Sequence, residues 1–104
     1  MTVPFACDML AIPAGERTAH HQLTRRLMSE VVEEINQNPD GFALRFPAEE
    51  YEAVAQFVSR ERLCCPFLHF ALEVAAARGP LWLHLSGPEG VKPFIQAELQ
   101  LPRQ

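Results

Sequence analysis

The sequence lacks an excess of positive charge and any long hydrophobic run. Its 104 residues hold 9 Lys and Arg against 13 Asp and Glu, a formal net charge of -4 at pH 7. Nucleic-acid binding needs a basic stripe that neutralises phosphates, so we expect no nucleic-acid partner. No segment approaches the roughly 18 consecutive apolar residues that suggest a membrane-spanning helix, and the first residues lack the pattern of a secretory signal. We therefore expect a cytoplasmic protein with no membrane partner.

Cysteine is also scarce, with three residues in the chain. An odd number of cysteines without an export signal argues against a framework of structural disulfides. Packing, metal binding and redox chemistry remain as roles for these thiols. The hydrophobic share of 48% is that of an ordinary globular protein, and the length fits a single domain over residues 1–104.

The spacing of apolar residues predicts three helices. Apolar side chains recur every four residues from Leu23 to Ile35, which indicates one amphipathic helix. A second helix is expected from near Pro47 to the two adjacent cysteines. A third is expected to begin near Gly90, because a proline three residues later is tolerated only in the first turn of a helix.

Alternating apolar and polar residues predict strands at residues 42–46, 66–74 and 81–86. The order α-β-α-β-β-α and the single apolar face of each strand predict an α+β domain of two layers, with the helices on one face of the sheet. The sheet has three strands, or four if the segment around Cys7 adds an edge strand. A ferredoxin-like split βαβ arrangement is the simplest topology.

The stretch "SRERLCCPFLHF" at residues 59–70 contains the vicinal cysteines. Pro66 disfavours the helical conformation for Cys65, so the helix is expected to end near Cys64. Continued backward, the alternation of the following strand places Cys65 on the side of Phe67 and His69, away from the core. A disulfide between adjacent cysteines would close a strained ring, so we expect the two sulfurs to meet different neighbours.

Cys7 is the remaining thiol, and we expect it to meet either Cys64 or Cys65. A site of soft thiolates selects mercury, copper(I) or zinc, and also arsenite. Zinc fits less well, because its structural sites use four ligands that usually come in short paired spacings.

Charged residues near the two vicinal cysteines are expected to support the thiol site. Glu61 falls on the apolar stripe of the second helix and needs a partner, for which Arg17 on the first helix is the candidate. Arg60 and Arg62 lie near the cysteines and favour the thiolate form, although the carboxyl end of a helix opposes it.

The second face of the sheet is expected to point away from the helices and to be partly aromatic. An exposed apolar patch on a small domain typically marks a surface for a ligand or partner, and we expect a homodimer through this face. No nucleophile is spaced to suggest a catalytic triad with its histidines. The residues proposed for this ligand or partner face are Phe67, His69, Trp82 and His84.

The chain resembles a family of small uncharacterised bacterial proteins marked by an early C-x-L and E-R, then E-R-x-C-C-x-F-x-x-F-x-L, then L-x-L-x-G-P-x-G-x-x-x-F. Met9 stands where the first motif has leucine. The resemblance implies no activity, but it implies that Cys7, Glu61 and both vicinal cysteines belong to one pattern. The matching residues are Cys7, Glu16, Arg17, Glu61, Arg62, Cys64, Cys65, Phe67, Phe70, Leu72, Leu83, Leu85, Gly87, Pro88, Gly90 and Phe94.

Three hypotheses for the function follow. In the first, Cys7, Cys64 and Cys65 bind a soft metal ion or metalloid, while Glu61 orients a ligand or exchanges a proton. In the second, the chain is a non-catalytic interaction domain that dimerises and whose cysteines are only packed. In the third, it is a thiol redox or sensor protein. The sequence does not establish an enzyme.

Overall fold

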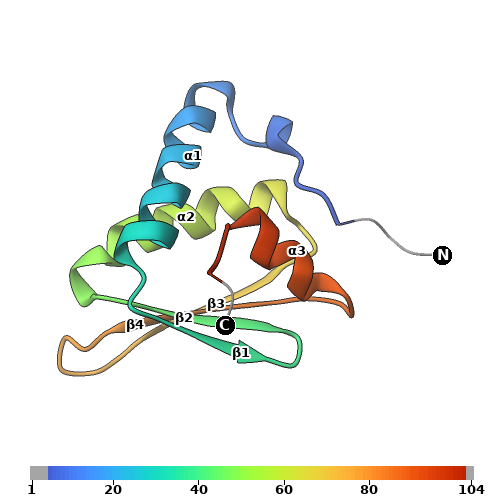
Figure 1. Cartoon of the computed structure of the whole chain (residues 1–104). Helices are drawn as coiled ribbons and strands as arrows, with labels where there is room; N and C mark the ends of the chain where they lie inside the picture. Colours follow the sequence, from blue (N-terminus) through green and yellow to red (C-terminus); the bar gives the residue numbers. More distant parts are fainter. Residues whose placement is uncertain (1–4, 103–104) are drawn as a thin grey trace.

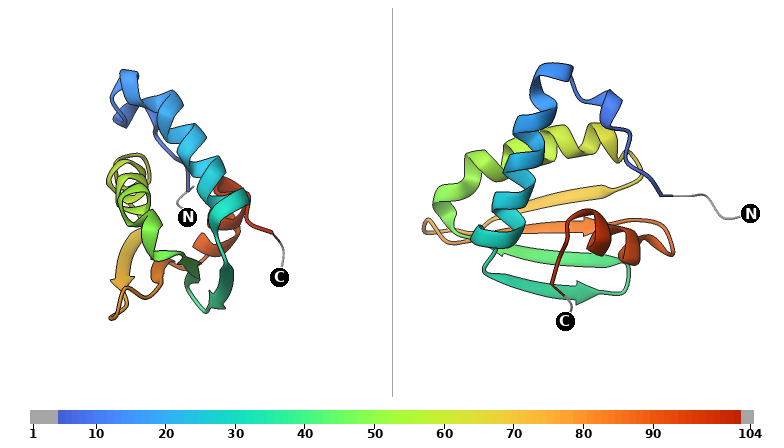
Figure 2. Two further views of the ribbon diagram at one scale, coloured as in Figure 1. Left: turned by 90° about the vertical axis from the view of Figure 1, so that its left-hand side faces the viewer. Right: turned by 45° about the horizontal axis from the view of Figure 1, so that its top comes forward.

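The computed structural model describes residues 5–102, which form three α-helices and one four-stranded sheet. All three helices lie on the same face of the sheet (Figures 1 and 2). The predicted α+β architecture of two layers is therefore confirmed. The helices are α1 (Arg17–Arg26), α2 (Tyr51–Cys64) and α3 (Val91–Glu98), and the strands are β1 (Glu34–Asn38), β2 (Gly41–Phe46), β3 (His69–Val74) and β4 (Leu81–Ser86).

The strands are arranged in the order β1-β2-β4-β3, and every neighbouring pair is antiparallel. Strands β2 and β3, which α2 connects, therefore run parallel to each other with β4 between them. This is the expected split βαβ unit. The predicted three-stranded sheet was one strand too small, because β1 pairs with β2 as an additional edge strand, and the observed order is α-β-β-α-β-β-α in place of the predicted α-β-α-β-β-α.

The first helix was predicted too long. Helix α1 ends at Arg26, a π-helical turn covers Leu27–Val31, and Ile35 then pairs with Leu44 across the β1–β2 hairpin. A spacing of four residues places side chains on one face of a helix, but it also places them on one face of a strand. Near the end of the periodic segment, β-branched side chains favour the strand because a helix restricts their rotamers.

The alternative source of a fourth strand, the segment around Cys7, was also wrong. This segment contains two short 3-10 turns, Met9–Ala11 and Ala14–Glu16, and no strand within the described residues 5–16. Its backbone instead reaches the end of α2, where the Asp8 amide donates a hydrogen bond to the Cys64 carbonyl over 2.8 Å.

The core lies between the helices and the leucine-rich face of β4, where Leu81, Leu83 and Leu85 are buried. Burying each such side chain contributes about 1.5–3 kcal/mol to the stability of the fold. Within residues 5–102, no helix is long and apolar enough to cross a membrane. The other large buried side chains of the core are Leu27, Met28, Phe42, Leu44, Phe46, Val54, Phe57, Val91, Ile95, Leu99 and Leu101.

Candidate functional site

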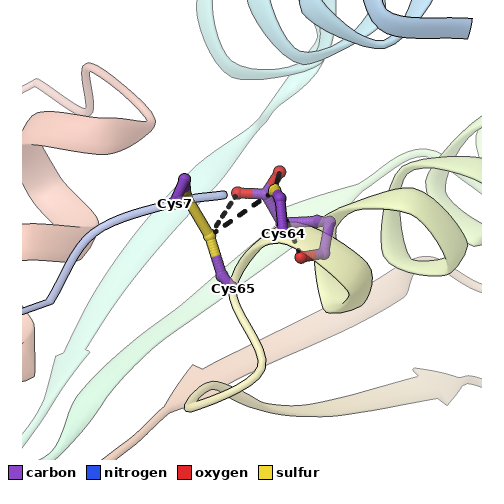
Figure 3. A group of neighbouring side chains, drawn as sticks. Cys7, Cys64 and Cys65 are labelled. Carbon is purple, nitrogen blue, oxygen red and sulfur yellow. Dashed lines mark hydrogen bonds between the residues drawn. A yellow bond between two sulfur atoms is a disulfide. The ribbon is translucent and has the colours of Figure 1, made fainter. Parts of the chain in front are cut away.

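The three cysteines meet at the carboxyl end of α2 (Figure 3). Cys7 and Cys65 form a disulfide, with their Cα atoms 5.0 Å apart and a sequence separation of 58. The odd number of cysteines had argued against a disulfide framework, yet the chain holds one disulfide and one free thiol, Cys64. Of the two vicinal cysteines, it is Cys65 that meets Cys7.

Pro66 explains why the helix ends between the two vicinal cysteines. Helix α2 ends at Cys64 as predicted, and Cys65 leaves the helical conformation with φ -125° and ψ 68°. The Leu68 amide then donates to the Cys65 carbonyl over 3.1 Å, which makes a turn before β3 begins at His69. Because this turn interrupts the strand alternation, Cys65 is buried beside Ile12 in a small apolar cluster. The prediction that it lies with His69 on the outer side of the sheet was wrong.

Cys64 is fully buried and touches three groups of the site. Its Sγ lies 3.7 Å from Cys65 Sγ, 3.5 Å from the Glu61 carbonyl oxygen and 3.6 Å from Glu61 Oε1. Burial, together with the charge and hydrogen bond of the Glu61 carboxylate, raises the pKa of the Cys64 thiol to about 12. The thiol is therefore protonated at neutral pH while the disulfide is present.

Glu61 is buried and joins the cysteines to α1. Its Oε1 lies 2.8 Å from His20 Nε2, and its Oε2 lies 3.6 Å from Cys65 Sγ. A sulfur in a disulfide carries no proton, so the second approach is a contact and not a hydrogen bond. The sequence correctly indicated a carboxylate on the core-facing side of α2, but it suggested the wrong partner, because Glu61 pairs with His20.

His20 is the site residue to which the sequence analysis gave no role. It lies on the apolar side of α1, is 2% exposed and stacks on Phe57 with ring centroids 5.7 Å apart. Its Nδ1 is buried and has no hydrogen-bond partner among the described residues. A histidine and a carboxylate, each on the apolar stripe of a predicted helix, were the available signal for this pair.

The three arginines proposed as supporting residues have other contacts. Arg17 donates from Nε to the carbonyls of Met9 and Ile12 over 3.0 and 2.9 Å, which holds the first 3-10 turn. Arg60 pairs with Glu16 at 3.3 Å, and Arg62 is exposed. The raised pKa of Cys64 has the opposite sign to the thiolate-favouring effect expected of Arg60 and Arg62.

A cavity of about 360 Å³ borders the His20–Glu61 pair on the side of α3. Burial and the neighbouring Glu61 carboxylate raise the pKa of the Glu98 carboxyl, which also lines this cavity. The π-helical turn after α1 contributes two further residues to the wall. The lining residues are Met9, His20, His21, Thr24, Arg25, Met28, Ser29, Glu61, Ala97, Glu98, Leu99 and Gln100.

After reduction of the Cys7–Cys65 disulfide, the side chains of Cys7, Glu61, Cys64 and Cys65 could together hold a metal ion. One ligand atom from each lies within 4.8 Å of all the others. A tetrahedral site with Zn–S bonds of about 2.3 Å has sulfurs roughly 3.8 Å apart. The 3.7 Å between the sulfurs of Cys64 and Cys65 is close to that spacing.

The proposed partner face is only partly assembled as predicted. His84 and Trp82 lie on adjacent outward positions of β4, where His84 Nε2 approaches Glu73 Oε1 at 3.6 Å, and His69 is exposed at the start of β3. Phe67 does not belong to this face. It precedes β3 and packs on Phe94 of α3, with ring centroids 5.1 Å apart.

No protein-family model, curated protein or solved structure matches the chain. The function is therefore argued from the site itself. The resemblance to the family with the E-R-x-C-C motif, which here begins at Glu61, stays a prediction.

Proposed function

We propose that the protein binds a soft metal ion or metalloid through Cys7, Cys64 and Cys65 once the disulfide is reduced. The observation that supports this is the convergence of three sulfurs and one carboxylate in a space of 4.8 Å. Thiolate sulfur prefers mercury, copper(I), zinc and arsenite over hard cations such as magnesium.

Loading requires a two-electron reductant, for which a cellular dithiol is the chemical class. Each of its two sulfurs loses a proton and the pair becomes a disulfide, while Cys7 and Cys65 each gain a proton. Cys7 is the partly exposed end of the disulfide, whereas Cys65 is buried, so the mixed disulfide with the reductant forms at Cys7. Reduction then leaves three thiols around the Glu61 carboxylate.

Glu61 has two roles in this proposal. Its carboxylate accepts the proton of a thiol that binds the ion, and its free oxygen is the fourth ligand for an ion that needs one. His20 keeps the carboxylate in place through the 2.8 Å contact with Oε1. His20 is therefore a positioning residue, and not a ligand.

The experiment is native mass spectrometry of the phosphine-reduced protein with zinc, copper(I), mercury(II) or arsenite. The wild type is expected to take up one ion, and a variant with Cys64→Ala and Cys65→Ala to take up none. Glu73→Gln, an exposed change on the outer face, is the matched control and should bind like the wild type. Equal uptake by the double variant, or no uptake by the wild type, would contradict the proposal. Uptake of mercury(II) alone would not support the proposal, because mercury reacts with almost any accessible thiol.

A second candidate is a redox sensor, which the Cys7–Cys65 disulfide beside a free thiol favours. In this case the two-electron change between disulfide and dithiol is itself the signal. Equilibration in glutathione buffers of known potential, read by alkylation and mass spectrometry, separates the candidates. A disulfide that remains oxidised at the potential of the cytosol, about -220 mV or lower, rules out metal loading there. A reversible midpoint near that potential without metal uptake favours the sensor.

A further inference from the structure

The residues around the three sulfurs carry little positive charge that is free to neutralise a metal complex. The Arg17 guanidinium is directed to the backbone carbonyls of residues 9, 10 and 12 and not to a sulfur, and Arg60 is paired with Glu16. His20, the buried basic residue of the site, is paired with Glu61. A complex with a net negative charge would therefore be buried without a counter-ion, which is strongly unfavourable.

The charge of the complex then discriminates between the soft ions. Three thiolates around a divalent ion such as zinc carry a net negative charge, and three around copper(I) carry more. Zinc also needs a fourth donor, and within the cluster that donor is the anionic Glu61, which adds further negative charge. Three thiolates around a trivalent metalloid carry no net charge.

Geometry also favours a centre with three ligands. The three sulfurs come from two chain segments and lie within 4.8 Å of one another, and reduction frees the Cys7 and Cys65 sulfurs from their disulfide beside Cys64 Sγ, which lies 3.7 Å from Cys65 Sγ. Mercury(II) forms a neutral complex as well, but its preferred linear arrangement uses two sulfurs on opposite sides of the ion and leaves the third unused. A pyramidal centre uses all three on one side.

We propose that the ligand of the reduced site is a trivalent metalloid hydroxide, of the class of arsenous and antimonous acid, held by Cys7, Cys64 and Cys65. This inference rests on the proposed function and names its ligand class. Three metalloid–sulfur bonds form and three metalloid–oxygen bonds break, and each hydroxide leaves as water with the proton of one thiol. Oxidation states do not change, and no charge accumulates in the site.

Glu61 lies where this proton transfer is needed. Its Oε1 is 3.6 Å from Cys64 Sγ and its Oε2 is 3.6 Å from Cys65 Sγ. The carboxylate takes the proton of a thiol and returns it to the departing hydroxide. The cavity that borders Glu61 offers space for the released water.

The test is the mass of the complex formed by the phosphine-reduced full chain with arsenite, and its competition with equimolar zinc or copper(I). The wild type is expected to gain one arsenic atom and to lose three hydrogens, with no hydroxyl retained. In the competition, the arsenic complex should be at least ten times as abundant as the zinc or copper(I) complex. Cys64→Ser and Cys7→Ser are each expected to give a complex with one retained hydroxyl and at least tenfold weaker binding, while Glu73→Gln matches the wild type.

Cys64→Ser and Cys7→Ser change opposite ends of the cluster, so one variant still tests the proposal if the other fails to fold. Circular dichroism shows whether each variant is folded. Binding of zinc or copper(I) without arsenite would overturn this inference and leave the proposed function intact. A wild-type arsenic complex that retains a hydroxyl would also overturn it, because fewer than three sulfurs would then be bound. Absence of binding by every ion would overturn both.

Discussion

At the scale of single residues, the His20–Glu61 pair is the contact on which the geometry of the site depends. Both side chains are almost completely buried, at 2% and 3% exposure. Removal of one member of a buried hydrogen-bonded pair leaves the other polar group without a partner, which costs about 1–3 kcal/mol. The pair Arg26–Glu50 lies at the surface, where such contacts contribute about 0–1 kcal/mol.

His20→Leu is therefore expected to lower the free energy of unfolding by about 1–3 kcal/mol, because Glu61 stays buried without its partner. Urea denaturation of the oxidised protein measures this change. The surface control Arg26→Ala should cost about 1 kcal/mol or less. Adding Glu61→Leu to His20→Leu should restore part of the loss, since no buried polar group is then left without a partner. Equal effects of His20→Leu and Arg26→Ala would show that the buried pair has no special role.

The raised pKa of Cys64 predicts its reactivity. With a pKa of about 12, the thiol of the oxidised protein is mostly protonated at pH 9, so its alkylation rate should keep rising with pH beyond that point. Iodoacetamide labelling followed by mass spectrometry measures the rate of this single free thiol. Glu61→Gln should lower the pKa, because the Glu61 charge raises it. A rate that levels off at pH 9 in the wild type would contradict the assignment.

The raised pKa of Cys64 also predicts how the free energy of unfolding depends on pH. The pKa of Cys64 is higher in the folded state than its ordinary value of 9.0, so the folded protein holds the thiol proton more tightly. This stabilisation is fully present below pH 9 and is lost as the pH rises towards 12. Urea midpoints should therefore fall over that range in the wild type and fall less in Cys64→Ala. Parallel curves for the two proteins would exclude the thiol as the cause.

At the scale of elements, close contact between β2 and β4 depends on Gly41. A Cβ atom there would meet the Leu85 carbonyl oxygen, so another residue pushes the two central strands apart. We expect Gly41→Ala to lower the free energy of unfolding by about 2–4 kcal/mol, measured by thermal and urea denaturation. Gly15→Ala is the control, since nothing lies within 4 Å of a Cβ at that position. A cost for Gly41→Ala no larger than that of the control would contradict the model of a tight β2–β4 contact.

The elements also show what the sequence could predict. Pro66 correctly located the end of α2 between the cysteines, because its effect on the preceding residue is local and steric. Strand β1 was missed because the spacing up to Ile35 satisfies a helix and a strand equally, and its pairing with Leu44 decides between them. The His20–Glu61 pair was missed for a similar reason, since its members lie 41 positions apart in sequence.

At the scale of the whole molecule, the disulfide joins the segment around Cys7 to the carboxyl end of α2. Closing a loop of 58 residues stabilises the folded state by about 4 kcal/mol in the chain-entropy model. The large core cluster contains neither cysteine of this disulfide, so we expect the reduced protein to remain folded.

The homodimer through the outer sheet face stays a prediction, for which sedimentation of Trp82→Glu against the wild type is the test.

Reduction should lower the free energy of unfolding by about 4 kcal/mol without loss of the fold. Urea denaturation with and without a phosphine reductant measures the difference, and circular dichroism checks the fold. Cys7→Ser should show no change on reduction, because it has no disulfide to lose. Unfolding of the wild type on reduction would remove the preformed site that metal loading requires.

The claim that three sulfurs converge on one bound ion is tested most directly by X-ray absorption spectroscopy of the reduced, loaded protein. At the absorption edge of the bound element, we predict a first shell of three sulfurs for the wild type and of two for Cys64→Ser. A shell of oxygen and nitrogen alone, or identical spectra for the two proteins, would contradict the shared site.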